Sequence, residues 1–388
     1  MPELSKKELC TGCTACASVC PKGCISMQPD KNGFVYPVID THKCIGCGLC
    51  EKVCPVLQPL KVAMDLPRSY AAYSTDKEAR LNSSSGGIFT EIAKTVLKNG
   101  GVVFGAAYNE RFEVIYICVE NESDLAKLRG AKYAQSDLCG IFVTVKECLE
   151  QGKKVLFSGT PCQVGGLKAY LRREYENLLT VDFVCHSVPS PMAWKAYVNY
   201  RAWQDNGGEL PSRINLRSKV TGWSRYQYSN RFEYGDGSVH NCKSGESLYM
   251  KLFVGGYINR ESCANCQFKG YSRISDLTIG DFWGIWDIAP DMDDDCGTSV
   301  VLCQSHRGAT LLETISNRVV MKQVTLEEAS RNNTAMLQSC IHDPRRQKAL
   351  DAIKIGDISE CEKLFVHKKR ILTRILNNVK RRFFVKRG

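Results

Sequence analysis

Two cysteine runs near the start of the chain constrain its fold more than any other feature of the sequence. The first is Cys10-x2-Cys13-x2-Cys16-x3-Cys20-Pro21, and the second repeats that spacing as Cys44-x2-Cys47-x2-Cys50-x3-Cys54-Pro55. Nine of the 21 cysteines of the chain fall within these first 54 residues. A disulfide framework explains such a pattern poorly in a chain of this size with no export signal. The clustering therefore indicates that the thiols bind metal.

The repeated run resembles that of bacterial ferredoxins with two 4Fe-4S clusters. In those proteins three closely spaced thiolates bind one face of a cluster, and the cysteine before the proline ligates the other cluster. On that pattern one cluster is held by Cys10, Cys13, Cys16 and Cys54, and the second by Cys44, Cys47, Cys50 and Cys20. The alternative is a pair of zinc sites, but zinc has no use for the third cysteine step or the proline. Cys24 lies outside both runs and is expected to be a small buried apolar residue.

Composition places the chain among globular proteins. Its 388 residues, 44% apolar and 24% charged, are enough for two or three domains. No apolar run approaches the roughly 20 residues of a membrane span, and the N-terminus lacks the apolar segment of a signal peptide. We therefore expect a cytoplasmic protein of the α+β class, with a ferredoxin-like module that is followed by a mixed α/β domain.

Strand, small-residue loop and helix patterns alternate after a linker at residues 58–67. Residues 83–87, Ser-Ser-Ser-Gly-Gly, begin a helical pattern that Gly100 ends, and residues 102–107 have the pattern of a strand. A second strand, at residues 153–157, leads through Gly159 and Thr160 into a helix at 164–175. Serines and glycines at a helix start offer N–H and O–H donors to an anion. Helix capping alone is the other interpretation, and both are open at this point.

Cysteines also follow two of the expected strands. Cys162 comes after the strand at 153–157, and Cys185 follows a third strand at 179–184. Ligands in open α/β sheets gather at the carboxyl ends of strands. The pair Cys263-x2-Cys266 supplies two more thiols, so the four thiolates of a further cluster are available.

Six groups of residues in this second part belong together. They are Ser84-Ser85-Gly86-Gly87, Gly130-Ala131-Lys132-Tyr133-Ala134-Gln135-Ser136, Thr160-Pro161-Cys162-Gln163, Phe183-Val184-Cys185-His186 with Pro189-Ser190-Pro191, Cys263-x2-Cys266, and Ile279-Gly280-Asp281-Phe282-Trp283-Gly284. They resemble the beta subunit of coenzyme F420 hydrogenase/dehydrogenase over roughly residues 68–340, and many members of that family also carry a ferredoxin module. One departure is Ser187, where glycine is expected after Cys-His.

The resemblance implies FAD and a 4Fe-4S cluster in the second domain. By position, the third cluster would be held by Cys162, Cys185, Cys263 and Cys266. Contacts with FAD are expected from Ser84, Ser85, Gly86, Gly87, Lys132, Tyr133, Gln135, Ser136, Gly159 and Thr160. His186 and Asp281, beside this site, are candidate proton-relay residues, and a structural role for each stays open. The domains would span residues 1–60 (ferredoxin-type), 68–340 (FAD and cluster) and 341–388 (a basic helical tail).

The eight remaining cysteines are scattered, and most are expected to be packing residues. They are Cys118, Cys139, Cys148, Cys242, Cys296, Cys303, Cys340 and Cys361. Cys242 is the spare ligand of the third cluster should Cys185 not bind it.

Positive charge is concentrated at the end of the chain. The net charge is +11, and residues 367–388 carry nine lysines and arginines with no acid, interleaved with apolar residues at helical spacing. Such a basic helix is suited to an anionic membrane surface, to an acidic ferredoxin or flavodoxin, or simply to packing on its own domain. No nucleic-acid-binding motif accompanies the charge, so we expect no nucleic-acid partner.

These features predict a flavin-dependent iron–sulfur oxidoreductase. It would pass electrons between a hydride donor or acceptor at FAD, either a deazaflavin or another organic molecule, and a ferredoxin-like carrier. No G-x-G-x-x-G motif follows an expected strand, so a nicotinamide cofactor is less expected as the hydride donor or acceptor than a deazaflavin. The alternative is a non-catalytic electron-transfer subunit of a larger redox complex, and a third interpretation is a zinc-bearing structural protein.

Overall fold

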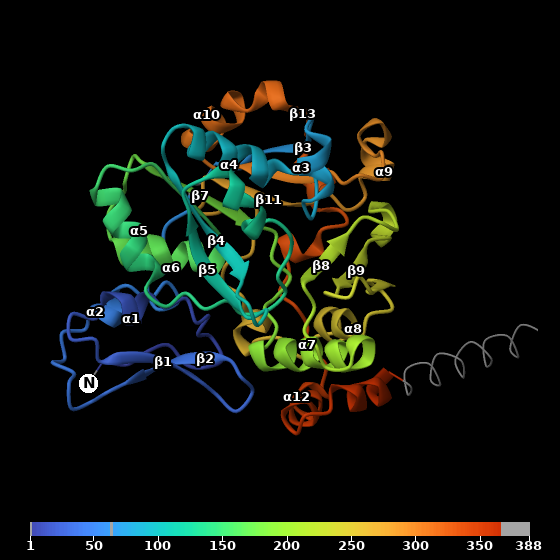
Figure 1. Cartoon of the computed structure of the whole chain (residues 1–388). Helices are drawn as coiled ribbons and strands as arrows, with labels where there is room; N and C mark the ends of the chain where they lie inside the picture. The colour runs from blue at the N-terminus through green and yellow to red at the C-terminus, as the bar shows by residue number, and fades with distance from the viewer. Residues whose placement is uncertain (1, 63–64, 366–388) are drawn as a thin grey trace, which may run out of the picture.

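An eight-stranded mixed sheet forms the centre of the computed structural model, which describes residues 2–62 and 65–365 (Figure 1). The order of its strands is β13-β3-β12-β11-β7-β6-β4-β5. The strands are β3 (Arg68–Ser74), β4 (Val102–Tyr108), β5 (Val114–Val119), β6 (Val155–Gly159), β7 (Leu178–Phe183), β11 (Leu277–Asp281), β12 (Ser299–Cys303) and β13 (Val319–Val324). Strands β4, β6, β7 and β11 run parallel, and the outer strands pair antiparallel. The carboxyl ends of four parallel strands thus lie together, where ligands of α/β sheets bind.

Helices cover both faces of this sheet. Successive side chains of a strand point to opposite faces, so apolar residues of one strand can pack against helices on both sides. In β4, Val103 packs in one apolar cluster with α4 (Ile88–Lys98) and α10 (His306–Thr314). Its neighbours Val102 and Phe104 pack in another cluster with α5 (Ile141–Glu150) and α6 (Pro161–Leu171). The expected helix–strand pairs at residues 88–107 and 153–184 are therefore present, and the mixed α/β class of this part is confirmed.

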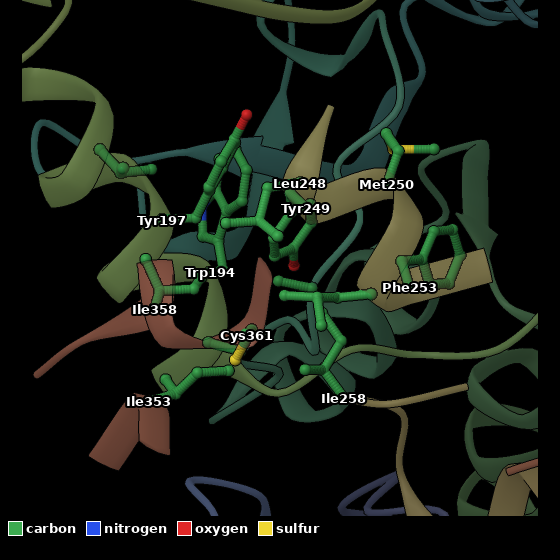
Figure 2. Packing of buried hydrophobic residues seen from close by; sticks show 14 of the residues in the cluster. Trp194, Tyr197, Leu248, Tyr249, Met250, Phe253, Ile258, Ile353, Ile358 and Cys361 are labelled. Atoms are coloured by element: carbon green, nitrogen blue, oxygen red, sulfur yellow. The ribbon is translucent and has the colours of Figure 1, made fainter. Parts of the chain in front are cut away.

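A three-stranded antiparallel sheet, β10-β9-β8, stands beside the large one (Figure 1). It comprises β8 (Arg213–Ser218), β9 (Ser229–Glu233) and β10 (Val239–Lys243), and it packs with α7 (Pro191–Asn206), α8 (Leu248–Val254) and α12 (Arg346–Lys354). Figure 2 shows their aromatic core, in which Trp194, Tyr197 and Tyr249 lie in one cluster with Ile353 and Ile358. Part of the expected tail, up to residue 364, is thus packed into this core. The basic stretch at 367–388 lies outside the described residues.

The remaining elements are short. The helices are α3 (Lys77–Leu81), α9 (Ile285–Ile288) and α11 (Leu326–Ser330), and the 3-10 helices are η1 (Glu122–Leu128), η2 (Ser224–Tyr226), η3 (Glu261–Asn265), η4 (Pro290–Met292), η5 (Ser316–Arg318), η6 (Thr334–Met336) and η7 (Ile358–Glu362). Across the described ranges, the helices are all too short or too polar to cross a bilayer. The three expected domain boundaries stay predictions.

The N-terminal module is built of α1 (Ala15–Val19), α2 (Leu49–Lys52) and the hairpin of β1 (Ile25–Pro29) with β2 (Val35–Ile39). Figure 1 shows its helices next to α6 and its hairpin below the main body. The hairpin turn is fastened by Ser190, whose hydroxyl donates to the carbonyl of Asn32 over 2.5 Å. The helices are fastened at Gly166 of α6, where a Cβ would lie only 2.7 Å from the Cβ of Cys13.

This close approach predicts that Gly166→Ala destabilises the protein by about 1–3 kcal/mol, because the added methyl group overpacks the interface between α1 and α6. The loss should exceed the roughly 1 kcal/mol that alanine gains over glycine inside a helix. The measurement is anaerobic denaturant unfolding followed by circular dichroism. Gly245→Ala is the control, because a Cβ at Gly245 meets no atom within 4 Å. Equal midpoints for the two variants would contradict the packing argument.

Candidate functional site

The two cysteine runs surround two separate hollows in the N-terminal module. One hollow is lined by Cys10, Cys13, Cys16 and Cys54, and the other by Cys20, Cys44, Cys47 and Cys50. Each set therefore combines three cysteines of one run with the fourth cysteine of the other run, as the ferredoxin pattern predicts. Gly12, Gly46 and Gly48 each have a φ near +70°, which lets the backbone between the cysteines turn back on itself.

Burial disfavours the ionised form of two thiols of the first set, Cys13 and Cys16. Burial raises the pKa of the Cys13 thiol to about 12, and burial and neighbouring thiols also raise the pKa of Cys16. A thiolate ligand must lose its proton, and the charge of bound iron compensates for that loss. In the described residues, no three His, Cys, Asp or Glu side chains are placed to hold a single metal ion.

Cys24 is buried in an apolar cluster, as expected. It lines the second hollow, and its sulfur lies 3.3 Å from that of Cys20. The eight scattered cysteines differ from one another: Cys148, Cys303, Cys340 and Cys361 are buried, whereas Cys118 and Cys139 are exposed. Cys242 and Cys296 are intermediate, so burial fits the expected packing role at the first four and not at the two exposed cysteines.

A third set of four cysteines comes together in the main domain. Cys162 stands in the first turn of α6, Cys185 follows β7, and Cys263 and Cys266 lie at η3. All four line one small hollow of about 40 Å³. Desolvation raises the pKa of Cys162 to about 11 and that of Cys185 to about 12. The spare ligand named from the sequence, Cys242, lies on β10 and does not line this hollow.

A large cavity of about 290 Å³ opens at the carboxyl ends of the parallel strands. Eight of the ten residues expected to contact FAD line it, namely Ser84, Ser85, Gly87, Lys132, Tyr133, Gln135, Ser136 and Thr160. The other two, Gly86 and Gly159, do not line the cavity. A Cβ at Gly86 would lie 2.4 Å from the carbonyl oxygen of Ala72, and one at Gly159 would lie 2.6 Å from the hydroxyl of Tyr116. These two glycines are needed for close backbone packing around the cavity.

The cavity is lined by more positive than negative charge. Three cations, Arg129, Lys132 and Arg217, line the cavity together with one acid, Asp281. Asp281 accepts two 2.7 Å hydrogen bonds from Arg217. Within the described chain, Thr11 Oγ1, Arg129 Nε and Arg217 Nε are buried in this wall without a hydrogen-bond partner. Buried polar atoms are seldom left unpaired, so these donors fit an anionic ligand.

The loop at residues 83–87 is fixed by hydrogen bonds from Lys219, a residue outside the sequence motifs. Lys219 donates to the carbonyl oxygens of Arg80, Ser85 and Cys296 over 2.6 to 2.7 Å. Gly87, with φ +86°, then starts α4, so the N-terminus of an eleven-residue helix adjoins the cavity. Arg217 and Lys219 were missed from the sequence because they stand apart from the serine, glycine and cysteine motifs, and Arg129 was missed although it directly precedes the group at residues 130–136.

The two candidate proton-relay residues occupy different places. Asp281 lines the large cavity and is paired with Arg217. His186 lines the small third hollow, with its ring edge-on to Phe253 at 5.2 Å. Burial lowers the pKa of His186, and its Nε2 is buried without a partner among the described residues. A relay through either residue stays a prediction.

Comparison with known proteins identifies the family. The model of the coenzyme F420 hydrogenase/dehydrogenase beta subunit matches in two parts, its N-terminal part at residues 69–142 and its C-terminal part at 152–329. Together these ranges make up more than half of the chain. The chain belongs to the family of the coenzyme F420 hydrogenase/dehydrogenase beta subunit. Residues 9–57 match the 4Fe-4S dicluster domain, so this family member carries an iron–sulfur module fused to the beta-subunit domain.

Curated relatives of this family member include two archaeal proteins. One subunit of the F(420)H(2) dehydrogenase of Methanosarcina mazei is 24% identical over 197 residues, 47% of this chain and 55% of the relative. The coenzyme F420-dependent sulfite reductase of Methanocaldococcus jannaschii is 28% identical over 171 residues, 43% of this chain and 26% of the relative. The matches thus span about half of the first relative and about a quarter of the second.

Among solved structures, the F420-reducing NiFe hydrogenase complex from Methanosarcina barkeri contains a similar chain. The identity is 16% and the TM-score is 0.47, over 80% of this chain and 96% of that one.

The third cysteine set leads to a prediction about the iron content of the present protein. Three clusters would give about 12 irons per chain, and Cys185→Ser should lower that number to about eight, because a cubane needs its four thiolates. The measurement is iron and sulfide analysis after anaerobic purification. Cys242→Ser, on the distant β10, is the control and should keep all the iron. A full complement in the Cys185 variant would show that this cysteine is not a ligand.

Proposed function

We propose that the protein is an FAD-dependent iron–sulfur oxidoreductase. It would pass electrons between a hydride donor or acceptor at FAD in the large cavity and an external ferredoxin-like carrier. The observation that carries this proposal is the wall that the large cavity shares with the cysteine hollows. Cys162 lines both the large cavity and the third hollow, and Thr11 lines these two and the hollow of the Cys10 set. A ligand in the cavity would therefore adjoin two metal centres.

The residues of the cavity suit the parts of FAD. The pyrophosphate would be held by Arg129, Lys132 and the N–H groups at the start of α4, because a helix N-terminus and unpaired cations favour an anion. When bound, FAD accepts a hydride as an electron pair and releases its electrons one at a time. Lys219 keeps the 83–87 loop in place, and Arg217 stays fixed by Asp281. Asp281 would thus position Arg217 at the flavin.

The exposure of the cysteines gives the centres an order. Cys13 is buried against α6, whereas Cys47 of the second set is exposed. The hollow of the second set is lined by residues 2–50 alone. Electrons would thus run between the large cavity, the third and Cys10 sets, and the Cys47 set at the surface. Two electrons enter or leave as one hydride, and two one-electron carriers would balance them at the other end.

The substrate at the cavity is proposed from the relatives. Both curated relatives are named for coenzyme F420, and we propose this deazaflavin as the hydride donor or acceptor. The relative from Methanosarcina mazei is named as a subunit. This favours a second candidate, an electron-transfer subunit that docks in a larger redox complex and turns over no substrate alone. Attachment to a membrane through residues 367–388 is a further proposal that concerns undescribed residues.

The test is anaerobic purification, flavin release and reduction by candidate donors. One FAD and about 12 irons per chain, with bleaching by a reduced deazaflavin or by reduced ferredoxin, would support the enzyme. About eight irons without flavin would leave an electron-transfer module and refute the proposal. If flavin is present but deazaflavin, NADH, NADPH and reduced ferredoxin all leave the absorbance unchanged, the assigned reaction is wrong.

Lys132 predicts how flavin affinity depends on pH. Desolvation lowers the pKa of Lys132 to about 7, and a pyrophosphate nearby would favour the protonated amine. The affinity of flavin-free protein for FAD should therefore be highest below pH 7. Above pH 7 it should fall by up to tenfold per pH unit, since binding then takes up a proton. Fluorescence titration with FAD between pH 6 and 9 measures this slope.

Lys132→Met should weaken FAD binding and remove the slope. Lys127→Met is the matched control, because Lys127 pairs with Asp124 on η1 and does not line the cavity. A slope that persists without Lys132 would assign the proton to another group.

A further inference from the structure

Arg260 is a buried arginine that contacts three parts of the proposed electron path: the third hollow, the Cys10 set and the wall of the large cavity. It precedes η3, three residues before Cys263, and its side chain is only 1% exposed. It lines the third hollow together with Cys162 and Cys185. Its guanidinium nevertheless points to the N-terminal module, which makes it a contact between domains as well as a wall of the hollow.

The guanidinium bonds to two segments of the N-terminal module. Nε donates to the carbonyl oxygen of Cys10 over 2.9 Å, and Nη2 donates to that of Val35 over 3.1 Å. Nη2 also lies 4.0 Å from the sulfur of Cys10. The ring of Tyr36 covers the guanidinium at 4.1 Å. One side chain thus holds the first cysteine of the module and the strand of its hairpin.

The remaining donor reaches the wall of the large cavity. Nη1 donates to Oε1 of Gln135 over 3.0 Å, and the same oxygen accepts the N–H of Val35 over 3.2 Å. Gly12 makes this arrangement possible. A Cβ there would lie 2.6 Å from Nε2 of Gln135 and 3.1 Å from Nη2 of Arg260.

The charge of Arg260 has no carboxylate partner among the described residues. A buried cation without a counter-charge is costly. The nearest anions would be the thiolates, since the sulfur of Cys10 lies 4.0 Å from Nη2. Four thiolates make a ligated cluster an anion, and reduction adds one more negative charge.

We propose that Arg260 is a positioning residue that raises the reduction potential of the Cys10 cluster and fixes the N-terminal module against the flavin cavity. The proposal deepens the proposed function and rests on the assignment of clusters within it. A nearby cation stabilises the reduced, more negative state of a cluster, and burial strengthens this effect. Electrons arriving from the large cavity would then be drawn to the Cys10 cluster.

The test compares reduction potentials in full-length protein under anaerobic conditions, with titration followed by electron paramagnetic resonance. Arg260→Gln should lower the equilibrium constant for reduction of the Cys10 cluster at least tenfold, which lowers its reduction potential by about 59 mV for one electron. Arg260→Lys keeps the charge and should retain most of the wild-type potential. The cluster of the Cys47 set, remote from Arg260, should titrate unchanged in both variants.

Arg346→Gln is the matched control. Arg260 and Arg346 both lie near the ring of Phe34, at 5.7 and 5.8 Å. Arg346 donates to the carbonyl oxygen of Asn259, but it lines neither the third hollow nor that of the Cys10 set. Unchanged potentials in an iron-replete Arg260→Gln protein would overturn the proposal. An equal shift in the Arg346 or the Arg260→Lys variant would overturn it too, because the effect would then not come from this charge.

A second variant keeps the proposal testable if Arg260→Gln loses iron. Gln135→Glu leaves Arg260 in place and puts a carboxylate 3.0 Å from its Nη1, so it should lower the same potential. No shift in iron-replete Gln135→Glu protein would overturn the proposal. These potentials are measurable whether or not the protein binds flavin. A preparation without flavin would therefore count against the proposed function alone.

Discussion

The contact between Cys13 and Gly166 is the constraint on which the arrangement of the proposed redox centres depends. A side chain at Gly166 would displace the Cys10 set from α6. The same helix carries Cys162 in its first turn, four residues before Gly166 and on the same face, so the contact brings the first and third cysteine sets close together. The position of the strand β6 determines where α6 starts. The central sheet therefore determines how close the N-terminal module lies to the large cavity.

Parallel strands and buried thiols meet at this point for a physical reason. The carboxyl ends of β6 and β7 lead into loops whose backbone is free to turn, and these ends lie side by side in the sheet. Thr160 caps α6 in a capping box with Gln163, so the first turn is held without help from a ligand. Cys162 can then face two cavities at once. The hydrogen bonds of this capping box thus fix the turn of backbone that carries the thiol of Cys162.

The sequence allowed prediction of those parts of the site whose residues are neighbours along the chain. The spacing within each cysteine run predicted both sets, with Cys20 and Cys54 exchanged between them, and the structure groups them in that way. Arg217, Lys219 and Arg260 could not be predicted. Each acts across a distance of more than a hundred residues, on Ser84, Ser85 and Cys10 respectively. Such partners depend on how β8 and η3 fold back on the sheet, and no local pattern records that.

The buried cations form a consistent pattern when the proposed ligands are considered together. Arg129, Lys132 and Arg217 face the large cavity, while Arg260, Lys269 and Arg273 face the third hollow. Arg217, Arg260 and Arg273 are buried. Arg217 is paired with Asp281 and Arg273 lies 3.8 Å from Asp182, whereas Arg260 has no carboxylate partner among the described residues, and a buried charge without a partner costs free energy. Phosphates in the cavity and thiolates on iron would supply the missing negative charge. Binding of the cofactors would then complete the electrostatics of the fold, so that the fold and its redox centres depend on each other.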